Sequence, residues 1–114
     1  MEMQSTRLLT PEIIDQLPEL YSQEKVTDPL VHIKFFAPES SWSWYVIEYD
    51  KEDEDTLFGL VNGFEEELGY FSLSELEEYR SPLGLGVERD LSFVPTRLSD
   101  LRRQLSQLRK NANT

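Results

Sequence analysis

The sequence predicts an α+β fold: an antiparallel sheet of four to five strands, an N-terminal helix, a short middle helix and an amphipathic C-terminal helix. Three observations predict this class. From Leu30 to Tyr49, aromatic and β-branched residues recur at every second position on both sides of the turn-forming segment 37–41, as in a two-stranded hairpin. Further apolar segments of strand length follow it. Capping signals and leucines at helical spacing mark the helices. We expect the core to begin at the hairpin.

The first helix and the hairpin have clear local signals. The helix is predicted to begin at Thr10-Pro11-Glu12, which supplies a capping residue, a proline at the first helical position and an acid in the first turn. Pro18 predicts a break within this segment. In the first strand we expect one face to carry Val31, Ile33, Phe35 and Ala37. In the second strand we expect one face with Trp42, Trp44 and Val46, and the other with Tyr45, Ile47 and Tyr49.

The remaining strands are predicted from shorter patterns. Residues 56–61 form the expected third strand, and the turn dipeptide Asn62-Gly63 connects it to a fourth strand around 68–71. A short last strand is predicted at 90–94 and is closed by Pro95. The sheet is therefore expected to be a series of hairpins.

The two later helices are predicted from capping and periodicity. Ser72 and Glu75 have the spacing of a capping box, so a short helix is expected to continue to about Tyr79. The last helix is predicted from about Ser99 to Lys110. Its apolar stripe comprises Leu98, Leu101, Leu105 and Leu108.

Length and composition favour a single domain spanning residues 1–114, with a core at about 8–96 and a basic helix at about 99–110. The chain has no cysteine, which excludes disulfides, thiolate metal sites and thiol nucleophiles. No segment has the roughly 20 apolar residues needed to cross a bilayer, and the N-terminus lacks the pattern of a signal peptide. We therefore expect a cytoplasmic protein with no membrane partner.

The charge of the chain is acidic and unevenly distributed. The 22 acidic and 11 basic side chains give a formal net charge of -11. Residues 1–96 carry 21 acids and 6 bases, whereas residues 97–114 carry 1 acid and 5 bases. An acidic body attracts basic partners and repels nucleic acid and anionic lipid. The same balance is also common as a means of keeping a protein soluble.

The sequence offers few groups for catalysis, and we expect no enzyme activity, no metal and no cofactor. The only histidine, His32, lies in a predicted strand, where a structural role is more common than a catalytic one. Without cysteine, a zinc site could use only this histidine and carboxylates. The acidic run from Asp50 to Asp55 has an acid where an EF-hand needs its glycine. The carboxylate pair Glu48 and Glu67 leaves a small hydrolase as the least favoured alternative.

A colinear series of motifs over roughly residues 8–100 resembles a known family. The motifs are Leu9-Thr10-Pro11-Glu12-Ile13-Ile14, Asp28-Pro29-Leu30-Val31-His32-Ile33-Lys34-Phe35-Phe36, Trp42-Ser43-Trp44-Tyr45, Phe58-Gly59-Leu60-Val61-Asn62-Gly63-Phe64-Glu65, Glu67-Leu68-Gly69-Tyr70-Phe71-Ser72-Leu73-Ser74-Glu75-Leu76 and Glu88-Arg89-Asp90-Leu91. They are similar to those of the bacterial family catalogued as domain of unknown function twenty-nine fifty-eight. The resemblance implies a small acidic protein of plasmids and integrative elements, often encoded near conjugation and anti-restriction genes. It implies no catalytic residues, because none are defined for the family.

We therefore expect a non-enzymatic acidic binding protein of a mobile genetic element. Its expected partner is a basic, nucleic-acid-binding protein, and its acidic body is not expected to bind DNA directly. If hairpins connect the strands, two acidic runs could form one anionic ridge, which would mimic DNA and inhibit a host defence or DNA-binding protein. The predicted contact residues of the runs are Glu48, Asp50, Glu52, Asp53, Glu54, Asp55, Glu65, Glu66 and Glu67, with Glu75, Glu77 and Glu78 beyond them. Trp42 and Trp44 could add an aromatic platform for the partner, or they could belong to the core.

The basic C-terminal helix leaves three alternatives open. It could bind nucleic acid as an accessory factor of plasmid transfer, dock on the acidic body, or pair with its twin in a homodimer. Docking on the body is the interpretation we favour.

Overall fold

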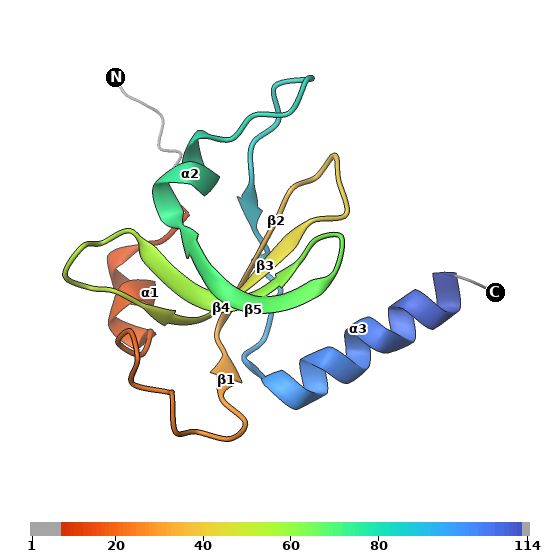
Figure 1. Ribbon diagram of the computed structural model, residues 1–114. Helices are drawn as coiled ribbons and strands as arrows, with labels where there is room; N and C mark the ends of the chain where they lie inside the picture. The colour runs from red at the N-terminus through yellow and green to blue at the C-terminus, as the bar shows by residue number, and fades with distance from the viewer. Residues whose placement is uncertain (1–7, 113–114) are drawn as a thin grey trace.

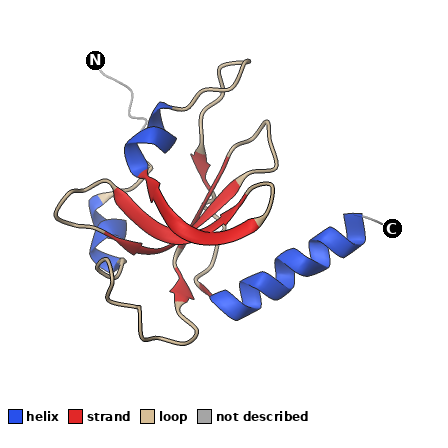
Figure 2. Cartoon of the chain, in the orientation of Figure 1, coloured by secondary structure: helices blue, strands red, loops and turns tan. Residues whose placement is uncertain are grey.

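Figure 1 shows the computed structural model, which describes residues 8–112 and has a curved sheet at its centre. The elements in chain order are α1 (Pro11–Gln16), β1 (Leu30–Val31), β2 (Ile33–Phe36), β3 (Ser43–Tyr49), β4 (Thr56–Asn62), β5 (Glu66–Ser72), α2 (Leu73–Glu78), β6 (Glu88–Arg89), β7 (Thr96–Arg97) and α3 (Leu98–Ala112). Five strands form an antiparallel sheet in the order β5-β4-β3-β2-β6, and β1 pairs with β7 separately. The helices flank the sheet and are not inserted between its strands (Figure 2). The predicted α+β class is confirmed.

The two short helices begin at the residues that cap them. The Thr10 hydroxyl accepts a hydrogen bond from the amide of Ile13 at 3.3 Å, and α1 ends just before Pro18. The Ser72 hydroxyl accepts a hydrogen bond from the amide of Glu75 at 3.3 Å, as one half of a capping box requires. In both cases a hydroxyl satisfies an amide that has no partner within the helix.

A β-bulge in β3 moves one aromatic residue to the other face of the sheet. The pairing of β3 with β4 shifts between Val46 and Glu48, so Ile47 is an extra residue. Beyond a bulge the alternation of faces reverses. Tyr49 therefore packs in the same core as Val46. The prediction that Tyr49 shares a face with Tyr45 is wrong.

An interruption at His32 separates two residues that were expected on one face. β1 ends at Val31 and β2 begins at Ile33. Val31 packs in one core, whereas Ile33 and Phe35 pack in the other. The amide of His32 still donates to the carbonyl of Val46 at 2.9 Å, so the chain stays beside β3. The alternation fails here because the strand is not continuous.

The sheet has a hydrophobic core on each face. The core under α1 and α2 contains Leu8, Leu9, Leu17, Ile33, Phe35, Ala37, Val46, Tyr49, Leu57, Leu73, Leu76 and Val87. The core under α3 contains Val31, Tyr45, Ile47, Leu60, Leu98, Leu101 and Leu105. Three of the four leucines of the α3 stripe therefore dock on the protein's own sheet, as the interpretation favoured from the sequence expects, whereas Leu108 is exposed.

No strand forms at residues 90–94, where the sequence predicts the last strand. β6 ends before this segment and β7 begins after it. The Asp90 carboxylate accepts hydrogen bonds from the amide of Ser92 at 2.9 Å and from its hydroxyl at 2.7 Å, which favours a turn. Leu91 is 82% exposed, so this apolar residue of the predicted strand is not buried in the core. Turn chemistry outweighs the weak alternation of this segment.

Candidate functional site

The acidic turn between β3 and β4 is held in shape by its own carboxylates. The Asp50 carboxylate accepts hydrogen bonds from the amides of Glu52 at 2.9 Å and Asp53 at 3.2 Å. The Asp53 carboxylate accepts from the amide of Asp55 at 2.8 Å and from the amide and hydroxyl of Thr56 at 2.9 and 2.6 Å. The bond from the Thr56 hydroxyl is the largest cause of the lowered pKa of Asp53. Local hydrogen bonds thus define the turn while the aspartates are ionised.

Asp55 joins this turn to α2. Its carboxylate accepts hydrogen bonds from the Ser72 hydroxyl and the Ser74 amide, both at 2.8 Å. The bond from the Ser74 amide is the largest cause of the lowered pKa of Asp55. On the other side of the turn, the amide of Lys51 donates to the carboxylate of Glu19 at 3.4 Å. The turn is therefore fixed between the segment after α1 and the start of α2.

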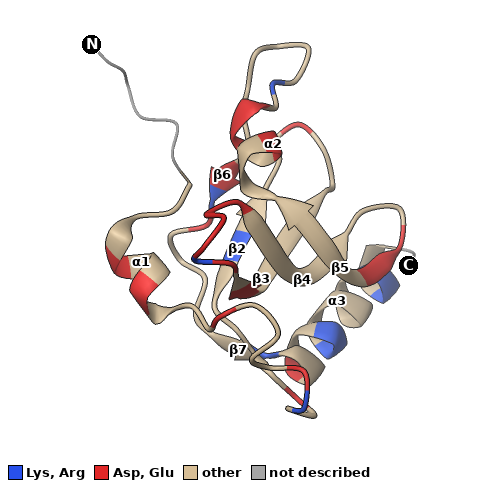
Figure 3. Ribbon diagram, turned by 60° about the vertical axis from the view of Figure 1, so that its left-hand side comes forward, with Lys and Arg blue, Asp and Glu red and all other residues tan. Residues whose placement is uncertain are grey.

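Four exposed carboxylates remain free beside these hydrogen-bonded aspartates. They belong to Glu52 and Glu54 in the turn and to Glu75 and Glu78 on α2. Within residues 8–112, these four carboxylates form neither a hydrogen bond nor an ion pair. We call these four residues, together with the three aspartates of the turn, the acidic surface. Figure 3 shows acidic segments at the turn and along α2 on one side, whereas the basic segments of α3 lie elsewhere.

Glu48 does not contribute to this surface, although the sequence predicts it as a contact residue. Glu48 is only 2% exposed. Its carboxylate accepts hydrogen bonds from the backbone amides of Tyr21 at 2.8 Å and Gln23 at 2.7 Å. Charge-assisted bonds of this kind compensate for removing a carboxylate from water. The placement corrects the prediction: Glu48 holds the loop before β1 against the sheet and cannot reach a partner.

The second acidic run does not extend the acidic surface. It lies at the opposite end of β4 from the acidic turn, because β4 runs from one hairpin connection to the other. The Glu66 carboxylate is 3.7 Å from Arg102 and 2.5 Å from Arg109 of α3. Glu65 and Glu67 are exposed at this end. The predicted single ridge is therefore wrong for Glu65, Glu66 and Glu67, which the length of β4 separates from the turn. The predicted Glu75 and Glu78 lie on α2, whose start is hydrogen-bonded to the turn.

Trp42 and Trp44 are half-buried and line a cavity of about 390 Å³ between the sheet and α2. Their ring centroids lie 6.1 Å apart. Trp44 packs against the core under α1 and α2, and Phe64 packs edge-on against Trp42 at 5.3 Å. The two indoles thus form a wall where the core meets the surface, rather than a flat platform or a fully buried pair.

Sequence reasoning missed a second cavity, of about 310 Å³, because its polar residues come from three separate segments. Gln16, His32, Arg89 and Asp90 are among the residues that line it. Burial lowers the pKa of His32, so its imidazole is neutral at pH 7. The Arg89 guanidinium donates a hydrogen bond to the carbonyl of Leu8 at 2.7 Å. The described lining includes no serine, threonine, cysteine or lysine, so it places no nucleophile beside the imidazole.

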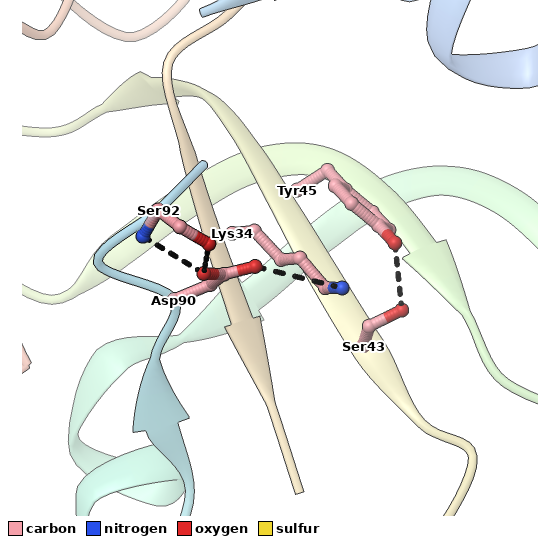
Figure 4. A network of polar contacts seen from close by, with 5 residues as sticks. All are labelled: Lys34, Ser43, Tyr45, Asp90 and Ser92. Carbon is pink, nitrogen blue, oxygen red and sulfur yellow. Dashed lines mark hydrogen bonds and ion pairs between the residues drawn. The ribbon is translucent and has the colours of Figure 1, made fainter. Parts of the chain in front are cut away.

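Asp90, which lines this second cavity, uses its carboxylate for contacts within the fold, and Figure 4 shows these contacts. One carboxylate oxygen accepts both bonds from Ser92, and the other lies 3.8 Å from the ammonium of Lys34. The bond from the Ser92 hydroxyl is the largest cause of the lowered pKa of Asp90. In the same view the Ser43 hydroxyl donates to the Tyr45 hydroxyl at 3.2 Å. These groups stabilise the turn and the strands, and the arrangement supports no catalytic assignment.

Two further observations concern the described part of the chain. Among residues 8–112, no group of three or more histidine, aspartate or glutamate side chains is arranged to hold a metal ion. In the same range no helix has both the length and the apolar character needed to span a membrane. The acidic surface and the tryptophan cavity remain the strongest candidate sites.

Comparison with known protein families identifies the family of the chain. The family model described as Protein of unknown function (DUF2958) matches residues 8–112, which confirms the family resemblance. No curated protein and no solved structure matches the chain.

Proposed function

We propose, given that this chain belongs to the DUF2958 family, that it is a non-enzymatic binding protein whose acidic surface binds a basic, nucleic-acid-binding protein. The family description assigns no activity, so the proposal depends on the chemistry of the surface itself. The observation that carries it is that no carboxylate of the acidic surface forms an ion pair within residues 8–112.

All ion pairs of the described residues lie outside the acidic surface. Two involve Glu66 with α3, one lies within α3 between Arg103 and Asp100, and one joins Lys34 to Asp90. The carboxylates of the acidic turn and α2 form no ion pair and outnumber Lys51, the one cation of the turn, so they repel one another. A cationic partner would relieve this repulsion, and the contact would weaken as salt screens it.

The fixed shape of the acidic turn supports specific binding over a role in solubility alone. Carboxylates held in one arrangement can match the spacing of cations on a partner. Mobile carboxylates would lose conformational entropy on binding, which weakens the affinity. A protein groove built for DNA phosphates is one such cationic target. In the setting of a mobile genetic element, the proposed partners are restriction enzymes, nucleases and repressors of the host. The DNA-mimic hypothesis is thus retained for the acidic surface alone.

The alternative of a DNA-associated accessory factor that uses α3 has weaker support. Arg102 and Arg109 pair with Glu66, and Arg103 pairs with Asp100. Contacts to DNA phosphates would have to replace these pairs. A homodimer through α3 would have to use its outer face, where Leu108 is 63% exposed, because the other three leucines of the stripe face the sheet. A small hydrolase is supported least.

The test is capture of a partner by the full-length protein at low and at high salt. A variant with Glu52→Gln, Glu54→Gln and Glu78→Gln removes three charges from the acidic surface while keeping the side-chain size. The matched control, Glu24→Gln, Glu65→Gln and Glu67→Gln, removes three exposed charges elsewhere. We expect a basic nucleic-acid-binding protein to be captured by the wild type and the control, released by salt, and lost from the first variant. Equal capture by both variants, or capture insensitive to salt, would overturn the proposal.

A further inference from the structure

The cavity beside the acidic surface combines aromatic walls with one carboxylate. Trp42, Trp44 and Tyr79 contribute the aromatic rings, and Glu75 of α2 contributes the carboxylate. Leu76 and Val87 form part of its apolar lining. Aromatic faces attract cations through their negative face potential, and the attraction increases when the cation is partly removed from water.

The indole of Trp42 is held in place by its neighbours. Its ring is 6.1 Å from that of Trp44, with 36° between the two planes, and Phe64 meets it at 82°. The ring also lies directly over Gly63, where any Cβ atom would overlap it. The aromatic wall is therefore largely formed before a ligand arrives, which lowers the entropic cost of binding.

The carboxylate of Glu75 has no competing cation in the described structure. It forms no ion pair within residues 8–112. Arg80 follows α2 closely in the chain, but its guanidinium donates to the carbonyls of Glu77 at 2.9 Å and Tyr79 at 2.6 Å. The cavity thus offers negative charge and aromatic faces while its neighbouring arginine is engaged elsewhere.

We propose that this cavity receives an arginine side chain of the basic partner, an inference that rests on the proposed function and specifies its chemistry. A guanidinium is planar, so it can stack on an indole and form a forked pair with a carboxylate at the same time. Its methylene stem would pack against Leu76 and Val87. A lysine ammonium is more strongly hydrated and lacks the planar fork, so it fits this combination less well.

The two indoles provide a direct measurement, because Trp42 and Trp44 are the only tryptophans of the chain. The probe is the peptide acetyl-Gly-Arg-Gly-amide, titrated into the full-length protein while the two indole N–H signals are followed by NMR. The control peptide carries citrulline, which keeps the shape of arginine and removes its charge. We expect both indole signals to shift with the arginine peptide, and the citrulline and lysine peptides to bind less tightly.

Two variants test the carboxylate. Glu75→Gln is expected to weaken binding of the arginine peptide about two- to fivefold, the range for an exposed ion pair. Glu24→Gln, an exposed acid outside both the cavity lining and the acidic surface, is expected to leave it unchanged. Equal shifts with the citrulline or lysine peptide, absence of shifts, or no effect of Glu75→Gln would overturn the arginine site. Salt-sensitive capture of a basic partner would in that case still support the proposed function, since its test leaves Glu75 intact.

Discussion

Asp28 caps α3 through Ser99, although the two residues are 71 positions apart in the chain. The Asp28 carboxylate accepts hydrogen bonds from the Ser99 amide at 2.9 Å and from its hydroxyl at 2.6 Å. The amide of Leu98 donates to the carbonyl of Pro29 at 2.9 Å. The N-terminus of α3 is therefore stabilised by the loop before β1, and the helix depends on the fold of the body.

We predict that Asp28→Ala loosens the first turn of α3. The Ser99 amide and hydroxyl would lose their acceptor, and the amide would have to bind water. Hydrogen exchange of the Ser99 amide should become faster, while Asp15→Ala, an exposed substitution on α1, should leave it unchanged. Unchanged exchange in Asp28→Ala would contradict the capping role.

The same pair predicts a pH dependence of this cap. The hydrogen bond from the Ser99 hydroxyl is the largest cause that lowers the pKa of Asp28 below its usual 3.8. A carboxyl with a lowered pKa in the folded state stabilises it above 3.8, and this contribution disappears as pH falls through the folded pKa. The stability difference between wild type and Asp28→Ala should therefore be present at pH 7 and vanish at strongly acidic pH. A difference that stays constant down to pH 2 would contradict the assignment.

Docking of α3 predicts different effects for two leucines on its apolar stripe. Leu105 is 6% exposed in the core under α3, whereas Leu108 is 63% exposed. Leu105→Ala should lower the free energy of unfolding by about 2–5 kcal/mol, the usual cost of truncating a buried leucine. Leu108→Ala should change it by less than about 0.5 kcal/mol. Urea unfolding measures both, and equal effects would contradict the docked position of the helix.

The parts of the fold that follow from local chemistry could be predicted from the sequence. Thr10 and Ser72 mark the starts of α1 and α2 because a cap needs only residues within one helical turn. The extra residue Ile47 left no comparable signal, since a bulge is defined by pairing with another strand. At 90–94 the apolar alternation competed with a turn nucleated by Asp90, and the sequence pattern alone does not rank the two.

Some features of the candidate site could likewise be predicted from the sequence, and others could not. The aspartates of the acidic turn were recognisable because their charge and their hydrogen bonds are local. Glu48 belongs to the same acidic run, but its acceptor role depends on amides 25 and 27 residues away in the chain. The tryptophan cavity likewise needs α2 to lie against the sheet, which places Glu75 beside the indoles. Tertiary contacts of this kind leave no spacing that a linear pattern can show.

The buried carboxylate of Glu48 predicts a large effect on stability. Glu48→Ala would leave the amides of Tyr21 and Gln23 without their acceptor, and a buried donor left unpaired costs about 1–3 kcal/mol. The free energy of unfolding, measured in urea, should fall by at least this amount. Glu52→Ala, an exposed acid of the neighbouring turn, should change it by less than about 0.5 kcal/mol. Similar effects of the two substitutions would show that Glu48 is not the anchor of this loop.

The buried imidazole of His32 predicts a loss of stability at a higher pH than the loss expected from the aspartates. Burial lowers its pKa below the usual value of 6.5, so the unfolded chain takes up a proton before the folded one does. Stability should therefore begin to fall as pH drops below 6.5, and this loss should end once pH is below the folded pKa. The carboxyls with lowered pKa act only below about 3.8; they are Asp28, Asp53, Asp55 and Asp90.

The imidazole can be followed without assignment, since His32 is the only histidine of the chain. Its NMR titration should give a pKa below 6.5 in the folded protein. In His32→Gln, which cannot take up a proton, the loss of stability that begins below pH 6.5 in the wild type should be absent. The wild type and the variant should thus differ in the slope of stability against pH in this range, because only the wild type gains a proton on unfolding at His32 there. A folded pKa at or above 6.5, or parallel slopes for the two proteins, would show that the imidazole lies in water rather than in the wall of its cavity.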